Sequence, residues 1–119
     1  MKKTLILGAS TNPTRYSYIA ANRLIDSGHP IVNVGQRIGN VANQPIEKPD
    51  IIHKDIHTLT MYIGASGQKD LYNYILETNP KRIIFNPGSE NTELTNLANQ
   101  KGIETIEACT LVMLSTNQY

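Results

Sequence analysis

The sequence predicts an α/β fold with a doubly wound, mostly parallel sheet of five strands, flanked by helices. Short apolar segments alternate with longer segments in which apolar residues recur at helical spacing. Gly, Asn and Pro stand where the chain must turn between them. Strands that alternate with helices are joined by right-handed crossovers, and such crossovers make neighbouring strands parallel. At 119 residues, the chain is expected to form one domain, residues 1–119.

The first half of the chain is expected to contain one helix and three strands. The helix runs from about Arg15 to Ser27, and Gly28 ends it. The segment Gly35–Pro49 is rich in Gly, Asn, Gln and Pro and predicts a loop. Asp50–Ile56 is compatible with a short edge strand or with a helical turn. The three expected strands are Thr4–Leu7, Pro30–Val34 and Thr58–Ile63.

The second half continues the alternation of helix and strand. Leu71, Tyr74 and Ile75 recur at helical spacing and indicate a helix through about Thr78. Consecutive apolar residues then predict a strand that is buried on both faces. The remaining expected elements, in order, are the strand Arg82–Asn86, the helix Asn91–Lys101, the strand Ile103–Ala108 and a short terminal helix, Thr110–Leu114.

The loops that follow the strands are the expected location of function. In a doubly wound sheet, ligands bind beyond the carboxyl ends of the strands, at the point where the strand order reverses. Five loops meet this description: Gly8–Thr14, Gly35–Asn40, Gly64–Gly67, Asn86–Ser89 and Ala108–Thr110.

The first of these loops has the pattern of a phosphate site. An apolar strand leads into Gly8-Ala9-Ser10, and a helix follows. Free N–H groups at a helix N-terminus and the helix dipole favour an anion there. Gly8 and Ala9 allow close approach of a ligand, or form a plain turn. Ser10 either caps the helix or contacts a phosphate. Arg15 offers a forked donor, or lies in solvent.

The choice of nucleotide depends on what the motif lacks. Of the glycines in a dinucleotide fingerprint, only Gly8 is present, and no acidic residue occurs between Asp26 and Glu47. Both departures count against NAD. Arg37 follows the second strand, where it could hold a phosphate on an adenosine ribose, as found in NADP and in coenzyme A. No Walker A spacing is present, which counts against ATP or GTP hydrolysis.

Taken in order, these segments resemble the small stand-alone coenzyme A-binding proteins of bacteria. They are also similar to the N-terminal coenzyme A domain of the succinyl-CoA synthetase α subunit. The likeness spans nearly the whole chain, although Gly35-Gln36 stands where the family usually has Asn-Pro. The matching pieces are Leu7-Gly8-Ala9-Ser10, Asn12-Pro13, Arg15-Tyr16-Ser17-Tyr18, Gly28, Val34 to Arg37, Pro87-Gly88, Asn91, Glu93 and Cys109.

The resemblance implies a Rossmann-like fold that holds the nucleotide of coenzyme A. The diphosphate would lie on the first turn and helix, and the adenosine near the loop after the second strand. Pro87-Gly88 would form a nest over the ligand or a plain turn. Cys109 is either a buried small hydrophobe or a thiol near the ligand. The expected ligand-binding residues are Gly8, Ala9, Ser10, Asn12, Arg15, Tyr16, Ser17, Gly35, Arg37, Pro87 and Gly88.

Composition narrows the range of partners. A net charge of +1 and few aromatic residues count against nucleic acid as a partner. No run of eighteen apolar residues is present, so we expect no membrane span, and the single cysteine fits a reducing cytoplasm. His53 and His57, four residues apart, have no third metal ligand nearby, so we expect no metal site. The apolar tail Leu111–Leu114 either packs on its own domain or forms a contact in a homodimer.

Three functions remain open at this point. The first is a protein that binds coenzyme A or an acyl-CoA and serves as a sensor, carrier or regulatory subunit, because no base, paired nucleophile or metal site converges in the sequence. The second is an NADP-linked oxidoreductase or redox sensor. The third is a degenerate interaction module that keeps the fold without the ligand.

Overall fold

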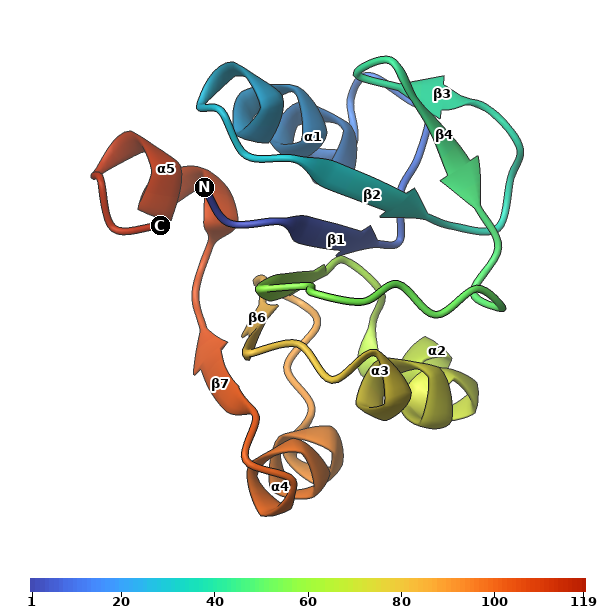
Figure 1. The fold of residues 1–119 in the computed structure, drawn as a ribbon, viewed down its shortest axis with the longest axis vertical. Helices are drawn as coiled ribbons and strands as arrows, with labels where there is room; N and C mark the ends of the chain where they lie inside the picture. Colours follow the sequence, from blue (N-terminus) through green and yellow to red (C-terminus); the bar gives the residue numbers. More distant parts are fainter.

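The computed structural model describes residues 1–119 as a twisted sheet between two groups of helices (Figure 1). The seven strands lie in the order β3-β4-β2-β1-β5-β6-β7. They are β1 (Thr4–Leu7), β2 (Ile31–Val34), β3 (Asn40–Val41), β4 (Gln44–Glu47), β5 (Thr58–Met61), β6 (Arg82–Phe85) and β7 (Glu104–Glu107). The helices are α1 (Tyr16–Asp26), α2 (Ala65–Gln68), the 3-10 helix η1 (Lys69–Leu71), α3 (Tyr72–Thr78), α4 (Thr92–Gln100) and α5 (Thr110–Ser115).

The predicted α/β fold with a mostly parallel sheet is confirmed, although the sheet has seven strands and not five. Strands β1, β2, β5, β6 and β7 correspond to the five expected ones, and all their pairings are parallel. The strand order reverses between β1 and β5, because the chain first builds outward through β2 and then returns to the other side of β1.

The two additional strands come from the segment 35–49, for which we expected a loop. Strand β4 pairs with β2 in parallel, and β3 pairs with β4 antiparallel. Ala42 and Asn43 form the turn between them with positive φ angles of 52° and 62°, as a two-residue hairpin turn requires. The buried Asn33 side chain donates to the carbonyls of Val41 and Gln44 at 3.0 and 3.3 Å. The hairpin is therefore fixed by a side chain from β2.

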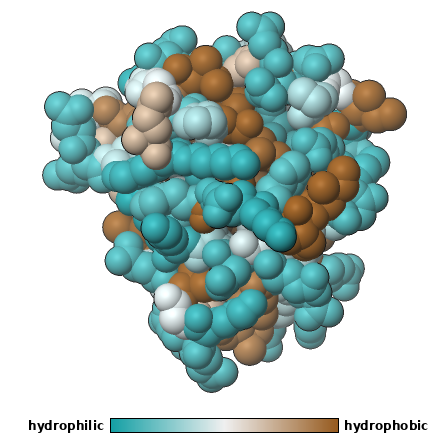
Figure 2. All heavy atoms as spheres, in the orientation of Figure 1, coloured by the Kyte–Doolittle hydropathy of each residue, from teal (hydrophilic) through white to brown (hydrophobic).

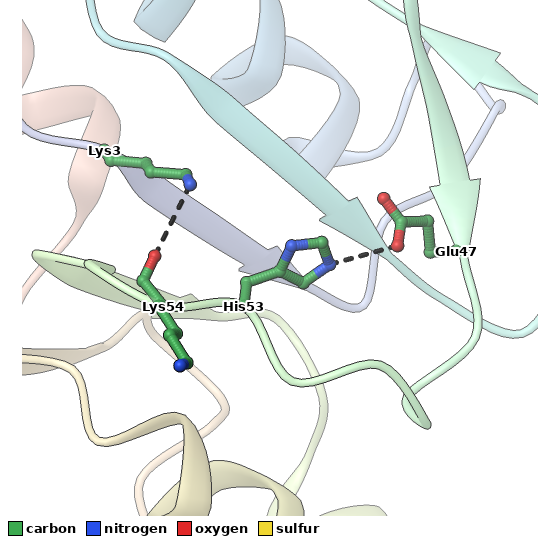
Figure 3. A network of polar contacts seen from close by, with 4 residues as sticks. All are labelled: Lys3, Glu47, His53 and Lys54. Carbon is green, nitrogen blue, oxygen red and sulfur yellow. Dashed lines mark hydrogen bonds and ion pairs between the residues drawn. The ribbon is translucent and has the colours of Figure 1, made fainter.

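The expected helix near Leu71 begins earlier and is broken into α2, η1 and α3. The segment 50–56 forms neither a strand nor a helix. Two contacts hold it against the sheet, shown in Figure 3: His53 Nε2 lies 3.0 Å from Glu47 Oε1, and Lys3 Nζ donates to the Lys54 carbonyl at 3.4 Å. His57 instead contacts the Thr58 hydroxyl at 2.7 Å. The two histidines therefore have different partners.

Each face of the sheet is covered by its own apolar cluster. Alternate residues of a strand point to opposite faces, and so Leu5 and Leu7 pack with α3 and α4, whereas Ile6 packs with α1 and α5. In the apolar tail, Met113 is buried on this domain while Val112 stays exposed. Figure 2 shows a largely hydrophilic face with separate apolar patches. None of the helices has the length and apolar character needed to cross a bilayer.

The amino end of the sheet is closed by Tyr119. Its side chain is buried, and its hydroxyl forms a hydrogen bond with that of Thr4. Arg82 donates to the Tyr119 carbonyl at 3.0 Å and lies over the Tyr119 ring, 4.6 Å from its centroid. The ring of His29 packs beside that of Tyr119 with centroids 4.9 Å apart. Polar groups at this end of the sheet are therefore paired within the protein.

Candidate functional site

A cleft of about 840 Å³ lies beyond the carboxyl ends of β1, β2, β5 and β6. The reversal of strand order between β1 and β5 opens it, because the loops after these two strands lead to helices on opposite faces of the sheet. Four of the five expected loops contribute residues to the cleft. The fifth, Ala108–Thr110, does not.

All of the expected ligand-binding residues line this one cleft. They come from three separate loops and the start of α1, and the fold brings them together. They are Gly8, Ala9, Ser10, Asn12, Arg15, Tyr16, Ser17, Gly35, Arg37, Pro87 and Gly88.

The amide groups of the turn after β1 donate hydrogen bonds to β2. The N–H groups of Gly8 and Ala9 both donate to the Val34 carbonyl at 2.9 Å. Gly8 has a positive φ of 100°, and a Cβ at this position would meet Ile63 and Tyr62 at 3.0 to 3.2 Å. The glycine is therefore needed for the turn and for packing against the end of β5.

Ser10 and Asn12 stabilise the turn rather than the helix. Ser10 Oγ accepts from the Asn12 N–H at 3.1 Å, and Asn12 Oδ1 accepts from the Thr14 N–H at 3.0 Å. The N-cap of α1 is Arg15, and no side chain caps the helix. The possibility that Ser10 caps this helix is therefore wrong.

The first turn of α1 presents unpaired donors to the cleft. The N–H groups of Tyr16 and Ser17 have no hydrogen-bond partner within the protein. Ser17 lines the cleft, and its hydroxyl also forms no hydrogen bond within the protein. An anion at the positive end of the helix dipole would satisfy all three donors.

The loop after β2 packs tightly against the first turn. A Cβ on Gly35 would lie 2.5 Å from the Ala9 carbonyl oxygen, so this close approach requires glycine. Arg37 follows at the rim of the cleft, where it is exposed and forms no ion pair. The Lys48 ammonium donates to the Gln36 carbonyl and ties this loop to the end of β4.

Two buried amides fix the opposite half of the cleft. Gln68 is fully buried and donates to the carbonyls of Ile63 and Ser89 at 2.7 and 2.8 Å. Asn86 donates to the Thr60 hydroxyl and accepts from the Thr110 N–H. These bonds join the ends of β5 and β6 to α2 and α5. The loop that carries Pro87 and Gly88 is therefore held rigidly.

The amide groups of this loop are already used within the protein. The Gly88 N–H donates to Glu90 Oε1 at 2.9 Å, and the Ser89 N–H donates to the Asn86 carbonyl at 2.9 Å. Both donors that a nest would offer to a ligand are paired, and so the geometry favours the plain turn.

Sequence reasoning did not single out several residues that line the cleft. Tyr62 and Ile63 follow β5, and Asp70 and Leu71 belong to η1. Burial raises the pKa of the Tyr62 phenol to about 12. For this region the sequence indicates only a strand that is followed by Gly64. Which side chains of the next, irregular helix line the cleft depends on the break of that helix at η1.

Cys109 lies outside the cleft. It is the half-buried N-cap of α5 and is absent from the lining. The next residue, Thr110, is fully buried and bonds the Thr60 hydroxyl at 2.8 Å. The loop after β7 therefore serves the contact between α5 and the sheet.

Comparison with protein families gives one match over most of the chain. A family model described as "CoA binding domain" matches residues 2–115. No protein of curated function matches the chain.

Solved structures repeat the fold closely. An uncharacterized protein of known crystal structure is 46% identical, with a TM-score of 0.98 and coverage of 100% of this chain and 98% of that one. A protein from Thermus thermophilus is 18% identical, with a TM-score of 0.86 and coverage of 99% and 90%. A hypothetical protein from Pyrococcus horikoshii is 19% identical, with a TM-score of 0.87 and coverage of 97% and 82%. The last two similarities show the fold alone.

Proposed function

Because the chain belongs to the family of CoA-binding domains, we propose that its cleft binds coenzyme A or an acyl-CoA. The first turn of α1 would hold the diphosphate. The loop after β2, with Arg37, would hold the phosphorylated adenosine. The protein would act as a sensor, carrier or regulatory subunit.

The observation that carries this proposal is the set of unpaired donors at the start of α1. The N–H groups of Tyr16 and Ser17 and the Ser17 hydroxyl converge on a cleft that also contains Arg15. Such a cluster matches a ligand with adjacent phosphate groups.

The side chains that line the cleft support a binding role over a catalytic one. Arg15, Arg37 and Asp70 are its charged residues, and the lining contains no histidine, cysteine or lysine. General acid–base or nucleophilic catalysis usually uses such groups with a partner that tunes their pKa. Here no pair of titratable side chains meets in the cleft.

The test is calorimetric titration with coenzyme A, NADP, NAD and ATP. We expect micromolar affinity for coenzyme A and weaker binding of the others. Arg15→Ala should weaken coenzyme A binding about tenfold, because it removes a charge-assisted hydrogen bond. Arg23→Ala, in the last turn of the same helix and outside the cleft, is the matched control.

The outcomes separate the alternative functions. Arg37 would also suit the ribose phosphate of NADP, so preferential binding of NADP would favour the oxidoreductase or redox sensor. Absence of binding to every nucleotide would favour an interaction module without a ligand. Equal affinity of the Arg15→Ala and parent proteins for coenzyme A would refute the site assignment.

A further inference from the structure

The charged side chains of the cleft are separated into two halves. Arg15 and Arg37 lie on the half formed by the loops after β1 and β2. Asp70 is the only acidic residue that lines the cleft, and it lies on η1, after β5. The strand order places β2 and β5 on opposite sides of β1. The cleft is therefore positive at one end and negative at the other.

The negative half has no internal counter-charge. Asp70 is exposed and forms no ion pair, and Lys69 beside it does not line the cleft. A second carboxylate, that of Glu90, is held by the Gly88 N–H at the margin of this half. The remaining walls of this half include the apolar side chains of Ile63 and Leu71.

We infer that Asp70 makes this site selective among acyl-CoAs, so that acyl groups ending in a carboxylate bind more weakly than uncharged ones. The inference rests on the proposed function. Coenzyme A carries its phosphates at the adenosine end, and its thiol end is uncharged. With the phosphates on the α1 and Arg37 half, the acyl group lies on the half of Asp70, Ile63 and Leu71.

The expected size of this selectivity is modest, because Asp70 is exposed to solvent. Two like charges about 5 Å apart in water repel weakly, and the repulsion is screened by salt. We expect a thioester with a terminal carboxylate to bind about threefold to tenfold more weakly than its neutral counterpart at low ionic strength. The difference should shrink at high ionic strength.

Butyryl-CoA and succinyl-CoA test the inference, because both acyl chains have four carbons and only one ends in a carboxylate. Titration of the parent protein should show weaker binding of succinyl-CoA. Asp70→Asn should remove that difference, and Asp70→Lys should reverse the preference. Asp26→Asn, at the end of α1 and outside the cleft, is the matched control.

The possible failures are distinguishable. Equal binding of the two thioesters to the parent protein at low ionic strength would overturn the selectivity alone, provided that coenzyme A binds. A difference that persists unchanged in a folded Asp70→Asn protein would also overturn it. The salt dependence of the difference in affinity between the two thioesters can be measured on the parent protein alone. A difference in affinity that salt does not reduce would overturn the inference, because it would arise from shape and not from charge. Failure of coenzyme A itself to bind would refute the proposed function and this inference together.

Discussion

Polar groups are paired within the protein at the amino end of the parallel sheet, whereas some are left unpaired at its carboxyl end. At the amino end, Thr4 and Arg82 are paired with Tyr119, whose side chain is 8% exposed. At the carboxyl end, the N–H groups of Tyr16 and Ser17 are left unpaired at the edge of an open cleft.

This difference indicates that one set of polar groups contributes to stability and another is available for binding. Polar groups that are paired inside the protein contribute to the free energy of unfolding. Groups at the open cleft that have no partner within the protein can bond water instead, so they contribute little to stability and remain available to a ligand. Substitutions at the amino end should therefore change stability without affecting affinity, and those at the start of α1 should do the reverse.

The largest expected effect is that of Tyr119→Ala. This change removes the buried ring, its packing on His29 and its contact with the Arg82 guanidinium. The free energy of unfolding should fall by about 3 kcal/mol, as for other buried aromatic residues. Urea denaturation measures the loss, and calorimetry should find coenzyme A affinity unchanged in the folded protein.

Tyr119→Phe separates packing from hydrogen bonding at this position. It keeps the ring and loses only the bond with the Thr4 hydroxyl, so the expected cost is about 1 kcal/mol. A large loss of coenzyme A affinity in either variant would contradict the separation of the two ends.

Gly35→Ala should affect both stability and binding, because Gly35 joins two loops of the cleft. Its Cβ would lie 2.5 Å from the Ala9 carbonyl oxygen and 3.2 Å from the Ile46 side chain. We expect a loss of about 1 to 3 kcal/mol in unfolding free energy, since the clash involves backbone. Gly64→Ala is the control, because its Cβ would meet only the Gly88 carbonyl oxygen, at 3.9 Å. Equal thermal stability of the two variants would argue against this packing.

Ser17→Ala tests the donors at the start of α1. The hydroxyl has no partner within the protein, so its loss should leave the melting temperature nearly unchanged. Affinity for coenzyme A should fall about tenfold if the hydroxyl donates to a charged phosphate. Ser27→Ala, at the C-cap of the same helix, should change neither quantity. Unaltered affinity in the Ser17 variant would remove this hydroxyl from the site.

The smallest expected effect is a pH dependence at the amino end. Burial, followed by the positive charges of the N-terminus, Lys2 and Arg82, lowers the pKa of His29 from 6.5. The unfolded chain then binds this proton more readily than the folded one. The contribution of His29 to stability is therefore complete above about pH 6.5 and is lost as the pH falls through the folded pKa.

A substitution isolates this contribution. His29 Nδ1 accepts from the Lys2 N–H at 3.0 Å, and His29→Asn keeps an acceptor without the titration. Urea denaturation at about pH 7.5 and about pH 5 should show a smaller acid-induced loss in the variant than in the parent. The pKa of His57 is also lowered, first by burial and then by Arg82, and should account for part of the remaining loss. Identical losses in the two proteins would exclude His29.

The regular elements could be predicted because their signals are local. The strand Thr4–Leu7 is found at the predicted bounds, and Asn91 caps α4 through its bond to the Leu94 N–H. The β3–β4 hairpin was missed because its turn uses Ala42 with a positive φ, which alanine rarely adopts. Asn33 in β2, eight residues before Val41, stabilises that hairpin by a contact that no local pattern reveals.

The site was predictable only in part. The order of strand, small-residue turn and helix indicated where an anion could dock, and the fold brings the expected residues around one cleft. Which donors are free was not predictable, because the Gly8 and Ala9 amides are taken up by Val34 from a neighbouring strand. The role of the Gly88 loop likewise depends on Glu90.

By itself, the sequence determined the kind of sheet and the edge at which its loops meet, because apolar periodicity and the alternation of strand with helix depend on neighbours along the chain. The tertiary structure decided which donors remain unpaired, that Cys109 lies outside the cleft, and that Asp70 lines the same cleft as Arg15 and Arg37. These properties depend on contacts between residues far apart in the sequence, and only the folded packing of β1 between β2 and β5 brings those residues together.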